Sequence, residues 1–215
     1  MQTIQLNKLL PHVFRERRDS LKSDIWLQQV SFERGKSYLI EAMSGTGKSS
    51  LCAYLIGYRN DFDGHILFDD KDTATISDTQ WTKLRTETFS LLFQELRLFP
   101  ELTAWENVEI KNRLTRHKSN AWIEQTFERL GIYEKLNAKV GKMSFGQQQR
   151  VAFVRALVQP ADFLLLDEPV SHLDDDNARI MAEILLEEKR ESGAAVIVTS
   201  IGKQLPITYY KTFSL

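Results

Sequence analysis

The sequence predicts an α/β fold in which a mostly parallel sheet is flanked by helices. Short, nearly continuous apolar runs alternate with helical patterns along most of the chain, as is typical of parallel strands buried on both faces. A loop rich in glycine and ending in lysine separates one such run from the helix after it. The stretch from about 95 to 140 has helical patterns only, so we expect it to form an inserted helical lobe.

The elements follow the chain in a clear order. Apolar or alternating runs predict strands at residues 25–32, 37–41, 65–68, 89–93, 163–167, 194–199 and 208–214. Helical patterns predict helices at residues 49–57, 77–85, 103–131, 146–158 and 174–190. Within 103–131 we expect two helices, because Thr103 and Glu106 fit a capping box and Ser119 or Asn120 can begin a second helix that ends at Gly131.

Length and composition narrow the class of protein. A chain of 215 residues with 42% hydrophobic and 27% charged residues fits one soluble domain. The net charge of −1 gives no global basic field, so no nucleic-acid partner is expected. Cys52 is the single cysteine, which excludes an internal disulfide framework and CxxC zinc sites.

The sequence contains no pattern for a membrane span. The longest run without Asp, Glu, Lys or Arg covers residues 192–202, whereas a spanning helix needs about 20 mostly apolar residues. The N-terminus lacks a basic region followed by an apolar stretch, so no signal peptide is expected. We therefore expect a cytoplasmic protein that reaches a membrane only through a partner.

The strongest chemical signal is the segment Ala42-Met43-Ser44-Gly45-Thr46-Gly47-Lys48-Ser49, which lies between a predicted strand and a predicted helix. That context suits a phosphate-binding P-loop, in which glycines let consecutive N–H groups face one anion. Lys48 would reach the β- and γ-phosphates and the Ser49 hydroxyl would ligate Mg²⁺. The alternative is a Gly/Ser loop that happens to precede a lysine. Ala42 replaces the first glycine of the motif and is strained if its φ is positive.

A second signal is the run FLLLDEP at residues 163–169. It places Asp167 and Glu168 at the carboxyl edge of the sheet, where α/β proteins bind ligands. Asp167 would hold Mg²⁺ through a water, and Glu168 would orient and deprotonate an attacking water. The alternative for this segment alone is an acidic turn after a strand.

A third signal is the segment MSFGQQQR at residues 143–150, where a helix is expected to begin. Ser144 is a natural N-cap. Its hydroxyl and the first helical N–H groups could instead receive a γ-phosphate. A capped helix start alone is not specific for a phosphate. This segment becomes specific because it lies between the glycine-rich loop and the FLLLDEP run in the chain.

Taken together, these segments resemble the ABC-type ATPases, over nearly the whole chain from about Phe14. MSFGQ at 143–147 resembles the family signature LSGGQ, Gln94 resembles the Q-loop glutamine, and residues 171–174 resemble the D-loop. Phe14 lies where the family places an aromatic ring on adenine. The segment 96–108 resembles the lipoprotein-releasing, macrolide-export and cell-division ATPases.

The resemblance implies a P-loop NTPase core with an antiparallel N-terminal β part and an inserted helical subdomain. Residues 1–94 and 146–215 would form the core, and 95–145 the subdomain. It also implies bound ATP and Mg²⁺, with Gln94 contacting the metal and the attacking water. The residues expected to bind ATP are Phe14, Ala42, Met43, Ser44, Gly45, Thr46, Gly47, Lys48, Ser49, Ser50, Ser144, Gly146, Gln147 and Asp174.

The resemblance implies partners as well. The signature residues of one subunit would close over the P-loop of a second, identical or related, cassette. A separate integral membrane subunit would dock near Gln94, where Leu96, Leu98 and Phe99 could offer an apolar groove. We expect the protein on the cytoplasmic face of the inner membrane.

The sequence departs from the family pattern at three places. Ser200 stands where the family has its switch histidine, so we expect slow hydrolysis with ATP binding retained, and Ser200→His to raise the rate. Phe145 replaces the first signature glycine, and only a short tail follows Ser200. These departures leave open a weakly hydrolysing or regulatory subunit. A soluble ABC ATPase of DNA repair or translation and a P-loop kinase are the further alternatives.

Overall fold

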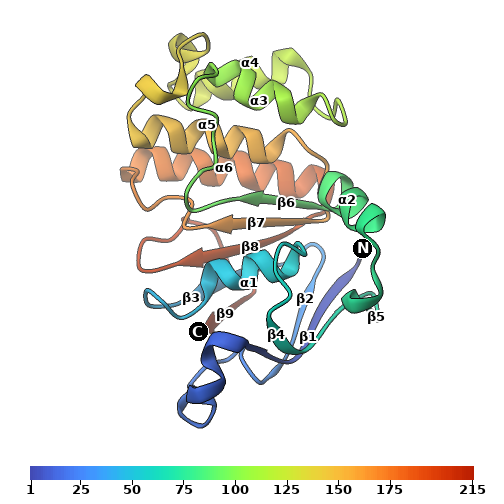
Figure 1. Cartoon of the computed structure of the whole chain (residues 1–215). Helices are drawn as coiled ribbons and strands as arrows, with labels where there is room; N and C mark the ends of the chain where they lie inside the picture. The colour runs from blue at the N-terminus through green and yellow to red at the C-terminus, as the bar shows by residue number, and fades with distance from the viewer.

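The computed structural model describes residues 1–215 and contains two sheets with helices around them (Figure 1). The parallel sheet consists of β3 (Ser37–Glu41), β6 (Phe89–Leu92), β7 (Phe163–Asp167), β8 (Ala195–Ser200) and β9 (Lys211–Ser214). Its strand order is β6-β7-β8-β3-β9, and every neighbouring pair is parallel. The predicted α/β fold class is confirmed.

The second sheet is antiparallel and lies in the N-terminal part of the chain. It consists of β1 (Thr3–Pro11), β2 (Gln29–Glu33), β4 (Phe62–Phe68) and β5 (Lys71–Asp72), in the order β2-β1-β4-β5. Together with α1 (Lys48–Leu55) it lies on one side of the parallel sheet, and α5 (Phe145–Leu157) and α6 (Asp175–Ser192) lie on the other (Figure 1).

Strand β7 shows why its run of apolar residues is continuous. Phe163 and Leu165 pack into the core shared with α1 and the antiparallel sheet, whereas Leu164 and Leu166 pack into the core shared with α5 and α6. Because side chains alternate along a strand, both sets must be apolar when both faces are covered.

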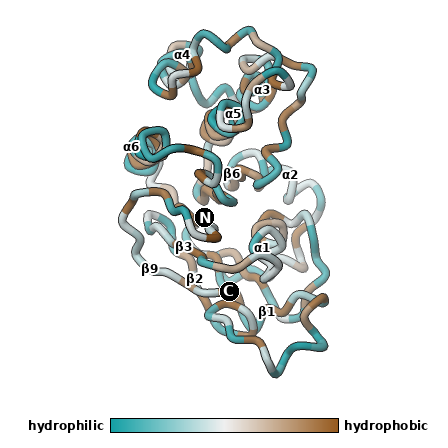
Figure 2. Tube along the Cα trace, turned by 90° about the vertical axis from the view of Figure 1, so that its left-hand side faces the viewer, coloured by the Kyte–Doolittle hydropathy of each residue, from teal (hydrophilic) through white to brown (hydrophobic).

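The remaining helices lie beyond the sheet edge. Figure 2 separates α3 (Ala104–Asn112) and α4 (Asn120–Arg129) from the layer that holds α1 and the antiparallel strands, and α2 (Asp78–Glu87) lies beside β6 (Figure 1). Thr103 and Glu106 form the predicted capping box, and the Ser119 hydroxyl caps α4. The short 3-10 helices are His12–Ser20, Thr73–Thr75, Tyr133–Lys135 and Val140–Lys142.

The prediction of a strand at 25–32 is wrong for residues 25–28, because β2 begins only at Gln29. The Ser23 hydroxyl accepts hydrogen bonds from the N–H groups of Ile25 and Trp26, and Leu27 has a φ of 63°. These features make a turn, and its buried Ile25 and Trp26 are apolar because they fill the core. The turn at Arg34 and Gly35 joins strands of two different sheets.

Two further differences concern the ends of the chain. Strand β1 has no counterpart among the expected strands, although it is central in the antiparallel sheet; Lys8 at a φ of 53° interrupts its register between Asn7 and Leu10. The last strand begins at Lys211. No helix lies between β8 and β9.

None of the helices combines the length and the apolar composition that a membrane crossing requires.

Candidate functional site

The predicted P-loop joins the end of β3 to the start of α1. Gly45 and Gly47 have φ values of 81° and 101°, in the left-handed region that glycine adopts without steric cost. Gly47 is the N-cap of α1, so the first N–H groups of this helix point toward the loop. Ala42 is not among the residues of positive φ, and the substitution of the first glycine therefore introduces no backbone strain.

Two aromatic side chains support this loop from behind. The Trp26 indole N–H donates to the Thr46 carbonyl at 3.0 Å. A Cβ on Gly47 would lie 3.0 Å from the Trp26 ring and 3.1 Å from the Phe14 ring. Position 47 therefore needs glycine for space as well as for φ. No local pattern in the sequence links Trp26 to residue 46.

Phe14 is buried, with 8% of its surface exposed, and packs on Trp26 at 6.3 Å between ring centroids. Little of the ring is available for stacking on a base. Its contact with adenine stays a prediction. The contact that the structure shows is with Gly47 of the loop.

Three oxygen donors meet beside the loop. The Ser49 hydroxyl donates to Asp167 Oδ2 at 2.7 Å and lies 3.2 Å from Gln94 Oε1. The hydroxyl of Thr199 donates to the other oxygen of Asp167 and fixes the carboxylate. Hydroxyl, amide and carboxylate oxygens are the donors that Mg²⁺ prefers, and Mg²⁺ usually keeps several waters beside one or two carboxylates. The three residues predicted as metal ligands therefore fit this ion.

Lys48 and Glu168 form an ion pair within the same site. The Lys48 ammonium lies 3.5 Å from Glu168 Oε1 and 3.3 Å from the Met43 carbonyl. Both side chains are about nine-tenths buried or more. A cation and a carboxylate are thus held next to each other between the glycine-rich loop and the end of β7.

The backbone of Glu168 is held in an unusual conformation. Its φ is 51°, which is uncommon for a residue with a Cβ. Its N–H donates to the Thr199 hydroxyl at 3.3 Å, and its carbonyl accepts from Gln149 Nε2 at 3.1 Å. Strained positions of this kind persist where the surroundings fix them, and they cluster at functional sites.

The signature-like segment begins α5 with a reciprocal cap. The Ser144 hydroxyl accepts from the Gln147 N–H at 3.3 Å, and Gln147 Oε1 accepts from the Ser144 N–H at 3.0 Å. No hydrogen bond or ion pair connects Ser144, Gly146 or Gln147 to the loop 42–49 of the same chain. The structure thus does not bring these predicted site residues to the P-loop.

Phe145 and the D-loop-like segment lie against each other. The Phe145 ring packs edge-on to His172 at 4.4 Å between centroids, and it remains 44% exposed. Asp174 caps α6 by accepting from the Asn177 N–H at 2.8 Å, and this hydrogen bond lowers the pKa of its carboxyl group. Asp174 therefore has a structural partner in its own chain.

Ser200 is buried and its hydroxyl is engaged locally. It donates to the Lys203 carbonyl at 2.8 Å and accepts from the Gly202 N–H at 3.0 Å. The side chain therefore contacts the turn after β8 and makes no hydrogen bond with Glu168. A histidine at this position would break both bonds.

Leu96, Leu98 and Phe99 were predicted to line an apolar groove near Gln94, and this prediction is wrong for Leu96. Leu96 is buried in the core, with 3% of its surface exposed, and Leu98 is only partly buried beside that core. Phe99 is 52% exposed. The backbone of Leu96 is left-handed, with a φ of 59°.

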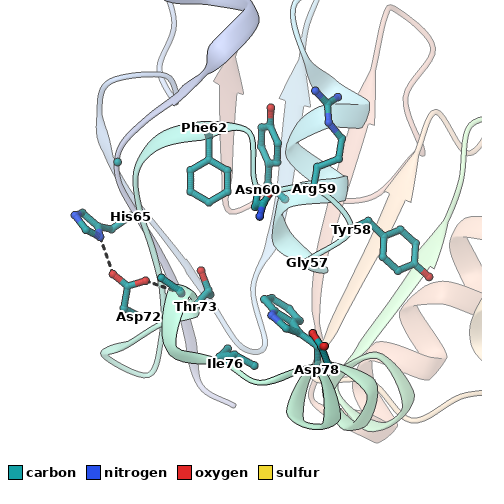
Figure 3. A pocket seen from close by; sticks show the side chains of 14 residues that line it. Gly57, Tyr58, Arg59, Asn60, Phe62, His65, Asp72, Thr73, Ile76 and Asp78 are labelled. Carbon is teal, nitrogen blue, oxygen red and sulfur yellow. Dashed lines mark hydrogen bonds and ion pairs between the residues drawn. The ribbon is translucent and has the colours of Figure 1, made fainter.

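A separate surface groove of about 620 Å³ lies between the end of α1, β4 and α2 (Figure 3). Arg59, His65 and Asp72 are among its lining residues, and His65 pairs with Asp72 at 2.6 Å. None of the predicted site residues lines it, so it is distinct from the phosphate loop.

Comparison with known proteins relates this chain to a protein family. The family model described as ABC transporter matches residues 27–171. The chain is 36% identical over 176 residues to the macrolide export ATP-binding/permease protein MacB of Shewanella sp. (strain ANA-3), covering 79% of this chain and 26% of that protein. The chain thus spans about a quarter of the length of that relative.

The match to a shorter relative is more complete. The chain is 33% identical to the lipoprotein-releasing system ATP-binding protein LolD of Myxococcus xanthus, covering 79% of this chain and 78% of that protein. Its fold is similar to the dimeric structure of MJ0796, a bacterial ABC transporter cassette, with a TM-score of 0.75, 23% identity, and coverage of 91% and 87% of the two chains.

Proposed function

Because this chain belongs to the ABC transporter family, as one of its ATP-binding cassettes, we propose that its loop 42–50 and the oxygen cluster beside it bind Mg-ATP and hydrolyse the γ-phosphate bond. One observation carries the proposal. The Ser49 hydroxyl, Gln94 and Asp167 meet at the point where Lys48 pairs with Glu168, although these residues come from three separate segments.

The loop would hold the phosphates through its backbone. The N–H groups of residues 44–50 would surround the β-phosphate, and Lys48 would exchange its contact with Glu168 for phosphate oxygens. Ser49, Gln94 and Asp167 would hold Mg²⁺, which supplies charge neutralisation for the phosphates when bound.

Glu168 would act as the general base. Its carboxylate is buried next to Lys48, and Oε1 accepts no hydrogen bond, so it is available to accept a proton from water. The backbone bonds to Thr199 and Gln149 would keep it oriented. We propose that hydrolysis is slow, because the Ser200 hydroxyl is used by its own turn and adds no contact to the phosphate.

A second cassette would complete the site. The capped start of α5, with Ser144, Gly146 and Gln147, makes no hydrogen bond or ion pair with the chain's own P-loop, and a helix N-terminus favours an anion. We propose that these residues and Asp174 contact ATP bound to a second copy.

We propose an integral membrane subunit as the other partner, on the cytoplasmic side of the membrane. The names of MacB and LolD, a permease fusion and a lipoprotein-releasing ATP-binding protein, support such a partner. A regulatory subunit without hydrolysis is the second candidate, which the enclosed Ser200 hydroxyl favours.

Steady-state hydrolysis and ATP binding test the proposal together. We expect Glu168→Gln to lower kcat by about 10²–10⁴ fold, because the general base is lost, while calorimetry detects ATP binding as in the wild type. Lys48→Ala should abolish binding itself. Wild-type protein that binds Mg-ATP without turnover would identify the regulatory subunit, and absence of binding would contradict both candidates.

A further inference from the structure

The turn after β8 is built by a serine side chain and presents a lysine. The Ser200 hydroxyl bonds to the Gly202 N–H and to the Lys203 carbonyl, at 3.0 and 2.8 Å. Ser200 is itself 2% exposed. The turn is therefore anchored in the protein interior, and it fixes the backbone from which the Lys203 side chain extends.

Lys203 reaches the loop that follows Glu168. Its ammonium donates to the Leu173 carbonyl at 2.6 Å and lies 2.8 Å from Asp175 Oδ1. Asp175 is almost fully exposed, so the ion pair is screened by solvent and contributes little. The bond to the Leu173 carbonyl is charge-assisted, and this class of hydrogen bond is the stronger one.

The loop that Lys203 contacts, residues 168–173, begins at Glu168, and hydrogen bonds hold it at that end. Glu168 is left-handed and is held by Thr199 and Gln149, and the Ser171 hydroxyl donates back to the Glu168 carbonyl at 3.3 Å. Lys203 fastens the other end, at Leu173. The segment 168–173 is thus held at both ends, by Thr199 in β8 and by Lys203 in the turn after β8.

We propose that Lys203 is a positioning residue for hydrolysis, which fixes the loop 171–174 and through it the orientation of Glu168. The inference rests on the proposed ATPase function. Lys203 makes no hydrogen bond or ion pair with the P-loop or with the proposed metal ligands of its own chain, so it would act on turnover and leave nucleotide binding to that P-loop unchanged.

The kinetics of Lys203→Met separate a positioning role in turnover from a role in nucleotide binding. Loss of one charge-assisted bond should lower kcat by about tenfold, with KM and the ATP dissociation constant within about twofold of wild type. Lys203→Arg keeps a cationic donor and should retain most of the activity. Lys135→Met is the matched control, because Lys135 is exposed and makes no ion pair, and it should match the wild type.

A spectroscopic measurement follows the loop directly. Cys52 is buried, so a spin label at His172→Cys would attach selectively, and its mobility should increase when Lys203→Met is added. Unchanged kcat or unchanged label mobility in active protein would overturn the inference. A parallel loss of ATP binding would also overturn it, because the role would then be structural. If the wild type itself lacks hydrolysis, the proposed function fails instead.

Discussion

At the scale of single residues, the least expected feature is a half-buried lysine without a carboxylate partner. Lys111 in α3 makes no ion pair, and its ammonium lies 3.3 Å from the Ser90 hydroxyl in β6. Burial, together with the nearby charge of Arg155, lowers the pKa of Lys111 to about 8. The charged form is therefore disfavoured in the folded protein.

This lysine predicts a pH-dependent stability. Between pH 8 and the ordinary pKa of 10.5 the unfolded chain binds more protons at this residue than the folded chain. The free energy of unfolding should therefore rise with pH across this window, by up to about 3 kcal/mol relative to Lys111→Met. Urea unfolding of both proteins at several pH values measures the difference. A difference that stays constant with pH would contradict the assignment.

The same scale shows what the sequence could predict at the site. Lys48, Ser49, Asp167 and Glu168 were predicted to lie at one edge of the sheet from the positions of their segments, and Gln94 was predicted from the family resemblance. The structure brings all five together, and their roles in the site stay a prediction. The role of Trp26 could not be predicted, since its contact with Thr46 depends on a turn that Ser23 forms outside any regular element. The left-handed Glu168 likewise depends on contacts from two other segments.

At the scale of elements, Arg155 links α5 to the segment after Gln94. Its guanidinium donates to the carbonyls of Leu96 and Arg97 at 2.5 and 2.7 Å. Leu96 and Arg97 are both left-handed, with φ of 59° and 47°. Burial lowers the pKa of Arg155 to about 10. The helix that begins with the signature-like residues thus ends by holding the backbone next to Gln94.

Arg155→Met tests this link. Two carbonyls would lose their donors, and we expect the free energy of unfolding to fall by about 2–3 kcal/mol. Arg155→Lys should be intermediate, because an ammonium lacks the planar fork that spans two carbonyls. Arg113→Met is the control: Arg113 is exposed and pairs only with Glu109 in its own helix, so its change should be within about 0.5 kcal/mol. Equal effects of the two Met variants in urea unfolding would exclude the link.

Elements were predicted well where periodicity and caps agreed. The Thr103–Glu106 and Ser119 caps are local, and β7 is recognisable because both of its faces are covered. Strand β1 was missed because the left-handed Lys8 breaks its alternation after Leu6. Which strand belongs to which sheet could not be predicted either, because the pairing of β1 with β4 joins residues about 60 positions apart.

At the scale of the whole molecule, the main expectation is assembly around nucleotide. Ser144 has two roles that one substitution can separate. Ser144→Asp retains an N-cap acceptor for the Gln147 N–H, and therefore the helix, but adds a negative charge where a partner's phosphate would approach. In the Glu168→Gln background, we expect ATP-dependent dimers in sedimentation experiments, and their loss with Ser144→Asp.

The chain provides a matched control for that experiment. Ser119 caps α4 in the same way, by accepting from the Trp122 N–H at 3.1 Å, and Ser119→Asp should leave dimer formation unchanged. Dimers that persist in Ser144→Asp would show that this helix start does not face the nucleotide of a second copy.

The Trp26 indole, which donates to the Thr46 carbonyl, also provides an intrinsic fluorescent probe of the proposed phosphate-binding loop. Ring emission depends on the polarity and hydrogen bonding around the side chain, and Trp26 is joined to the loop that would have to adjust around a triphosphate. With Trp81, Trp105 and Trp122 replaced by phenylalanine, the intrinsic fluorescence would come from this one position, and occupancy could be followed optically without any attached dye.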